Sequence, residues 1–146
     1  MERADTERWR TLLLDHAEAP RGRPLTAEAP AAVDFRDPAT GDRVALAVEL
    51  ASDGTTIAAI LWRASGSTVL RASASIMAEQ ASGLTPVAAH DHAEAFLKTL
   101  TTPEGDSADA WTALGDAEAL QGIRHLPARV KCAALPWRCL LAALEP

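Results

Sequence analysis

Two cysteines are the most reactive side chains in this chain of 146 residues. Cys132 lies near the predicted start of a helix that opens at Pro127, and Arg129 and Lys131 stand beside it. A helix N-terminus and nearby cations both favour the thiolate, so we expect the pKa of Cys132 to be lowered and its sulfur to be nucleophilic or metal-binding. The alternative is that this thiol fills a small space in the core.

Cys139 follows seven residues later in the same apolar segment. On one helix this spacing separates the two residues by two turns, about 10 Å, which a disulfide does not span. We therefore expect Cys139 to be core packing and both thiols to be reduced. The chain also opens without the apolar segment of a signal peptide, and no apolar stretch approaches the roughly 20 residues of a membrane span. These features predict a cytoplasmic protein with no membrane partner.

Other polar residues suggest weaker sites. Asp42 follows a glycine, where it is either a ligand or an ordinary turn residue. His90 and His92 are two apart, so a helix points them to different faces, and we expect them to be solvated rather than to share a metal. His125 precedes a Leu-Pro pair and is either a substitute nitrogen ligand or, as we favour, a loop histidine. None of these residues alone identifies an activity.

Several function classes have no support in the sequence. Ser73 and Ser75 lack the Gly-x-Ser-x-Gly turn of a hydrolase nucleophile, so we interpret them as small residues for close helix packing. The eight glycines are scattered and form no phosphate-binding loop. Twenty acidic against fourteen basic residues give a net charge of -6, which argues against a nucleic-acid partner.

The elements that must position these residues follow from hydrophobic periodicity. Helical spacing over 5–17 is followed by three short stretches with the alternation of strands, and then by helical patterns only. This order predicts one α+β domain over 1–146, with an N-terminal helix, a three-stranded antiparallel meander and packed C-terminal helices. The predicted strands are 33–36, 44–50 and 57–62, and the predicted later helices are 69–81, 86–100, 116–121 and 127–144.

Three stretches of the chain together carry a family resemblance. The first joins Leu14-Asp15-His16 and Pro20-Arg21 to the turn at 37–42, the second is the small-residue run at 66–75, and the third is 114–122 continuing through 127–137. In order and spacing they resemble the U-type scaffold proteins of iron-sulfur cluster assembly, the SufU and NifU N-terminal type. The resemblance extends from about Leu12 to Leu141.

The resemblance implies a metal site that this chain carries only in part. Family members place a cysteine in an Asn-Pro-x-Cys-Gly-Asp turn, another after a glycine before the Ser-x-Ala-Ser helix, and a third in Arg-x-Lys-Cys. With the aspartate, these cysteines hold zinc or an iron-sulfur cluster. Here Thr40 and Ser67 occupy the first two cysteine positions, and only Asp42 and Cys132 remain. Hydroxyls are poor ligands because they stay protonated, so we expect no stably bound metal or cluster. A low-affinity site that adds His125 is the alternative.

The last predicted helix contains Pro136, which removes the N–H that would bond the carbonyl of Cys132. We expect either a kink or break near the cysteine, or compensating packing around Trp137.

The resemblance implies an accessory role in iron-sulfur cluster assembly, with a cysteine desulfurase as partner. Cys132 is the expected sulfur acceptor, with Arg129 and Lys131 as electrostatic support, and any enzymatic role is at most such sulfur transfer. The competing hypothesis is a repurposed protein-interaction module that keeps the fold without metal or sulfur chemistry.

Overall fold

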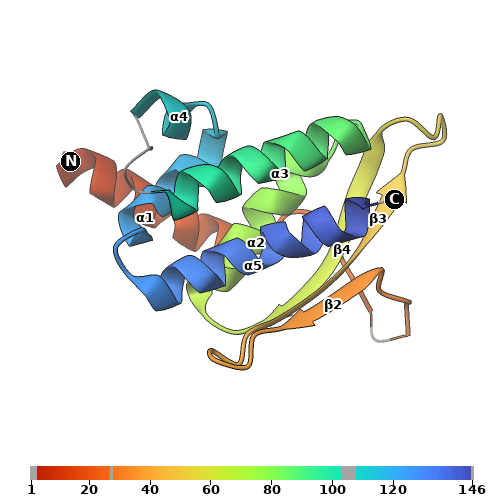
Figure 1. Cartoon of the computed structure of the whole chain (residues 1–146), viewed down its shortest axis with the longest axis horizontal. Coiled ribbons are helices and arrows are strands. Elements are labelled where there is room, and N and C mark those ends of the chain that lie inside the picture. Colours follow the sequence, from red (N-terminus) through yellow and green to blue (C-terminus); the bar gives the residue numbers. More distant parts are fainter. Residues whose placement is uncertain (1–2, 27, 103–107, 146) are drawn as a thin grey trace.

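The computed structural model describes residues 3–26, 28–102 and 108–145. The order of elements is a helix, a small sheet and then helices, as the sequence predicts (Figure 1). The helices are α1 (Arg3–Glu18), α2 (Thr68–Ala81), α3 (Pro86–Thr101), α4 (Ala108–Thr112), the 3-10 helix η2 (Gly115–Ile123) and α5 (Pro127–Leu144). Among the described residues, no helix is long and apolar enough to cross a membrane.

The sheet contains the predicted meander and one strand more. Its strands are β1 (Arg23–Pro24), β2 (Val33–Arg36), β3 (Arg43–Leu50) and β4 (Ile57–Ser65), in the order β1-β4-β3-β2. The pairs β2–β3 and β3–β4 are antiparallel, whereas β1 lies parallel to β4. Two residues are too few to show the alternation of a strand, so β1 has no signature in the sequence. Leu25, directly after it, is buried and donates its backbone N–H to the Trp62 carbonyl at 3.0 Å.

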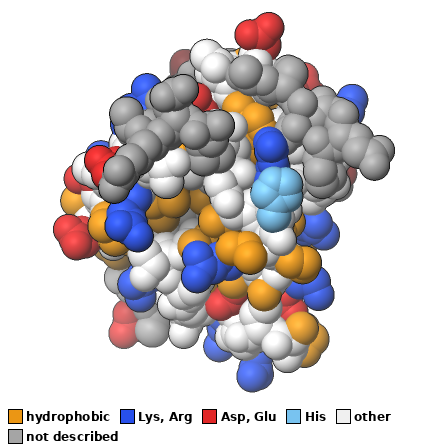
Figure 2. Space-filling model, turned by 90° about the vertical axis from the view of Figure 1, so that its left-hand side faces the viewer, with side chains coloured by type: hydrophobic (Ala, Val, Ile, Leu, Met, Phe, Trp, Pro, Cys, Tyr) orange, Lys and Arg blue, Asp and Glu red, His pale blue; other side chains and the backbone are white. Residues whose placement is uncertain are grey.

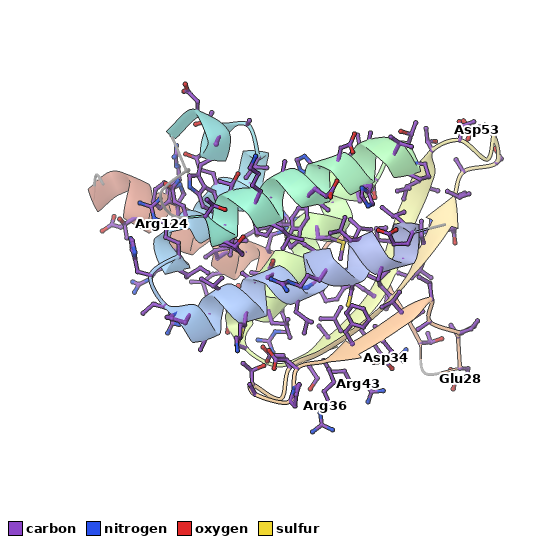
Figure 3. The ribbon with its side chains drawn as sticks, in the orientation of Figure 1. Glu28, Asp34, Arg36, Arg43, Asp53 and Arg124 are labelled. Carbon is purple, nitrogen blue, oxygen red and sulfur yellow. The ribbon has the colours of Figure 1, made fainter. Side chains whose placement is uncertain are left out.

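β2 forms the other edge of the sheet, and an ion pair between side chains joins it to β3. The guanidinium of Arg43 donates two hydrogen bonds to the Asp34 carboxylate, at 2.9 and 2.7 Å, across the β2–β3 pair (Figure 3). Arg36, at the end of β2, extends away from the sheet in the same view. A charged edge of this kind discourages pairing with a further strand.

The helices cover one face of the sheet (Figure 1). α2 packs on β4, α5 packs on β3 and β2, and α1 and α3 pack against α2 and α5 respectively. The core between them is built from large apolar side chains; its largest fully buried members include Trp111, Trp137, Phe96, Leu46 and Ile60.

α5 runs from Pro127 to Leu144 without a break, although Pro136 lies inside it and is buried. The alternative of a break at the cysteine is therefore wrong, and the proline is surrounded by close packing of Trp137. Trp137 stacks on Phe96 with ring centroids 4.3 Å apart and donates from Nε1 to Ser73 Oγ at 3.0 Å. Ser73 in turn donates to the Ala133 carbonyl at 2.6 Å. These contacts bind α5 to α2 and α3 around the proline.

Candidate functional site

Three elements bring the predicted site residues together. Asp42 directly precedes β3, Ser67 is the N-cap of α2, and Cys132 lies in the second turn of α5. The Cys132 thiol interacts with both the Asp42 carboxylate and the Ser67 hydroxyl. The structure thus joins residues that lie 25 and 65 positions apart in the sequence, as the family resemblance implies.

The turn before β3 is arranged to present Asp42 inward. Asp37 holds both ends of the turn, because its backbone N–H donates to the Asp42 carbonyl and its carbonyl accepts from Gly41, each at 2.8 Å. Gly41 adopts a φ of 79°, a conformation that favours glycine. Thr40 Oγ1 accepts the backbone N–H of Asp42 at 3.2 Å. Thr40, which occupies a position where the family has cysteine, therefore stabilises the turn through its hydroxyl.

Gly66 is required for the close approach of Asp42. A Cβ added at Gly66 would collide with Oδ1 of Asp42 and stand 2.7 Å from Leu70 Cδ2. The carboxylate is buried, and its Oδ2 has no hydrogen-bond partner among the described residues. A buried carboxylate oxygen without a protein partner is costly to desolvate, which makes Asp42 a candidate functional residue.

The electrostatic setting of Cys132 differs from the expectation. Burial raises the pKa of the Cys132 thiol, the Asp42 carboxylate raises it further, and the Ser67 hydroxyl only partly opposes them. Arg129 and Lys131 are exposed and are not among the causes of the shift in the pKa of Cys132. The predicted lowering of the pKa is therefore wrong, because packing removes the thiol from water while the cations stay in it.

Cys139 is core packing, as expected. It is fully buried, its Sγ lies 3.6 Å from the Val44 carbonyl, and burial raises the pKa of its thiol to about 12. The thiol is therefore neutral and inert at physiological pH.

The donor set does not fit the zinc or cluster of the family. Ser67 Oγ accepts the backbone N–H of Leu70 at 3.2 Å as a helix cap, and Thr40 Oγ1 serves the turn. Only Asp42 and Cys132 remain as anionic donors, half of a tetrahedral set. His125 is exposed, and within the described ranges it does not gather with these two into a three-ligand group. We therefore derive no chemistry from a metal at this position.

A groove leads to the thiol. Its volume is about 610 Å³, and its walls come from α1, the start of α2, η2 and the start of α5. The lining is mostly apolar, including Leu13, Leu14 and Val69, with Arg10 and Arg129 beside them and Cys132 within it. Figure 2 views this end of the molecule and shows hydrophobic side chains next to Lys and Arg side chains. Such a surface suits a partner segment that is apolar and acidic.

The remaining histidines behave differently from the expectation. His92 is half-buried, 2.7 Å from Gln80 Oε1 and packed near Trp137, so it is not a solvated residue. His90 Nδ1 lies 3.3 Å from Glu94 Oε1, and His90 Nε2 lies 3.2 Å from Glu145 Oε1. Both contacts are ion pairs when the imidazole is protonated.

The sequence interpretation missed one polar cluster, which centres on His16. This side chain is fully buried, with Nδ1 2.7 Å from Ser75 Oγ and Nε2 3.0 Å from Asp116 Oδ2. Ser75 is thus a hydrogen-bonding residue and not only a small one. The available signal was the position of His16 seven residues after Trp9, on the buried face of α1.

Comparison with known proteins shows the family to which the chain belongs. The model of the NifU-like N-terminal domain matches residues 9–133. The zinc-dependent sulfurtransferase SufU of Bacillus subtilis (strain 168) is 34% identical over 133 residues, covering 90% of this chain and 86% of that protein. The iron-sulfur cluster assembly scaffold protein IscU of Streptococcus pyogenes serotype M1 is 32% identical over 114 residues, covering 78% and 69%.

A crystal structure supports the same conclusion for the fold. It is of a protein from Fervidobacterium islandicum AW-1 described as an iron-sulfur cluster assembly scaffold for the SUF system, and it superposes with a TM-score of 0.77 at 22% identity, covering 92% of this chain and 94% of that one. Fold and site define the class of U-type scaffold domains. The chain belongs to the NifU-like N-terminal domain family.

Proposed function

We propose that this chain is a cytoplasmic accessory protein of iron-sulfur cluster assembly that docks on a cysteine desulfurase and accepts sulfur on Cys132. The observation that carries the proposal is the single thiol held beside a buried carboxylate at the wall of an open groove. The relatives support it, since one is named a sulfurtransferase and another a cluster assembly scaffold.

Asp42 supplies the base that the raised pKa of Cys132 makes necessary. The thiol is protonated at neutral pH and is a poor nucleophile in that form. Transfer of its proton to the Asp42 carboxylate produces the thiolate, which attacks the outer sulfur of the persulfide on the desulfurase. The sulfur–sulfur bond of that persulfide breaks, the desulfurase cysteine leaves as a thiolate and is reprotonated, and Cys132 becomes the persulfide. No external oxidant or reductant is consumed.

The groove explains how the donor reaches a buried thiol. A loop that carries the persulfide would lie along the apolar wall formed by Leu13 and Leu14, and Arg129 at the groove would attract an acidic flank. Arg129 then contributes to docking rather than to the pKa of the thiol.

Docking is tested with matched charge insertions. Leu14→Glu places a carboxylate in the groove, whereas Val87→Glu places one on α3 at a position that is 72% exposed and outside the groove. We expect Leu14→Glu to weaken binding to the desulfurase at least about tenfold and Val87→Glu to leave it unchanged, measured by calorimetry. Equal affinities for both variants would contradict the proposed docking surface.

The second candidate is a docking module without sulfur chemistry. Two observations favour it: the Cys132 side chain is only 8% exposed, and the pKa of its thiol is raised. Under this alternative, Cys132→Ala binds the desulfurase normally and no sulfur adduct forms on the wild-type chain.

A further inference from the structure

We propose a divalent-cation site formed by His16, Glu79 and Asp116, separate from the Asp42–Cys132 pair. These residues come from α1, α2 and η2, and their ligand atoms all lie within 4.8 Å of one another. An imidazole with two carboxylates is a donor set that Zn²⁺ and similar divalent ions accept. The inference does not depend on the proposed sulfur transfer.

The spacing of the ligand atoms is close to that of a coordinated ion. His16 Nε2 lies 3.0 Å from Asp116 Oδ2 and 3.9 Å from Glu79 Oε1. Ligands about 2.1 Å from a tetrahedral ion stand about 3.4 Å from each other, between these two distances. The carboxylate oxygens of Glu79 and Asp116 lie within 4.8 Å of each other, so this pair needs to close by at most about 1.4 Å to complete the coordination.

Neighbouring groups already orient the ligands. Arg21 Nε holds Glu79 Oε2 at 3.3 Å, which leaves Oε1 directed at the histidine. Ser75 Oγ faces His16 Nδ1 and accepts the backbone N–H of Arg21 at 2.8 Å. A hydroxyl both donates and accepts, so Ser75 accommodates the change from an Nε2–H to an Nδ1–H imidazole when Nε2 binds an ion.

Charge and access also favour a cation. Asp15, Glu79 and Asp116 with the guanidinium of Arg21 give a formal charge of -2, which a divalent ion neutralises, and Arg8 in the adjoining groove is paired with Glu118. His16 is fully buried, whereas the side chains of Glu79 and Asp116 are 42% and 41% exposed. Asp116 lines an open groove of about 830 Å³ along α1, so a fourth ligand such as water has room. Three protein ligands with a fourth position open to water is the arrangement of catalytic Zn²⁺ sites rather than of closed structural ones.

The test is Zn²⁺ binding to the full chain, stripped with chelator and titrated by calorimetry. We expect one ion per chain, an affinity lowered at least about tenfold by Glu79→Gln and by Asp116→Asn, and no change in Cys132→Ala. Glu118→Gln is the matched control, because Glu118 lines the same groove but is not a proposed ligand. Glu79 is exposed on α2, so its variant is expected to fold even if Asp116→Asn does not.

Co²⁺ provides an independent readout. The site predicts visible bands of a four- or five-coordinate ion without the near-ultraviolet charge-transfer band of a thiolate ligand. Absence of Zn²⁺ binding, binding that survives Glu79→Gln at full affinity, or binding lost in Cys132→Ala would each overturn the proposal.

Discussion

Replacing Ser73 with alanine tests how α5, and with it Cys132, is held against α2. The Ser73 hydroxyl accepts from Trp137 Nε1 at 3.0 Å and donates to the Ala133 carbonyl at 2.6 Å, and all three residues are buried. The variant leaves the indole N–H without a partner in the core.

The expected cost follows from these contacts. A buried donor deprived of its acceptor costs about 1–3 kcal/mol, and the better helix propensity of alanine returns roughly 0.5 kcal/mol. We predict a net loss of about 1.5 kcal/mol in the free energy of unfolding. For a domain of this size, that loss lowers Tm by roughly 5 °C.

Urea denaturation followed by circular dichroism measures the change. Ser82→Ala is the control, since Ser82 is the exposed C-cap residue of α2 and its hydroxyl donates to the Ala78 carbonyl one turn earlier, so we expect an effect below about 0.5 kcal/mol. In a Trp137→Phe background, the loss of unfolding free energy caused by Ser73→Ala should be smaller by about 1 kcal/mol or more, because phenylalanine has no N–H that would lose its acceptor. A Ser73→Ala effect no larger than that of Ser82→Ala, or full additivity in the double variant, would refute the reasoning.

Three further predictions concern the site and its surroundings. Asp42→Asn removes a carboxylate that raises the pKa of Cys132, so the pH profile of iodoacetamide alkylation should move to lower pH, and an unchanged profile would count against the contact. Thr40→Cys combined with Ser67→Cys restores two thiolates, so Zn²⁺ affinity in calorimetry should rise by orders of magnitude; no gain would mean that the turn no longer positions its ligands. Burial lowers the pKa of His92 below its ordinary 6.5, so the unfolded chain binds more protons and stability falls as the pH drops below about 6.5. His92→Gln should flatten this part of a stability-against-pH curve, and an equally steep curve would contradict the assignment.

Local pattern was sufficient to predict the main elements. Alternation identified the three strands of the meander, and Thr85-Pro86 correctly indicated the start of α3, where Thr85 Oγ1 caps Ala88 N–H at 3.1 Å. The convergence of Asp42, Ser67 and Cys132 came from the family resemblance, because no periodicity relates a turn to a helix 90 residues later.

Local sequence pattern did not predict the features that depend on tertiary packing. His16 meets Ser75 and Asp116 across 59 and 100 residues of sequence, so its burial becomes visible only in the fold. The direction of the pKa shift at Cys132 reversed for the same reason: the sequence shows cations nearby but not which groups lose their water.

The central claim is that Cys132 accepts sulfur directly. Its most direct test is to incubate the chain with the cysteine desulfurase of the same organism and cysteine, alkylate, and analyse the peptides by mass spectrometry. The account predicts a persulfide adduct on Cys132 and none on Cys139, the other cysteine of the chain. Desulfurase binding without any adduct on Cys132 would contradict sulfur transfer, and absence of both would contradict the role in iron-sulfur cluster assembly.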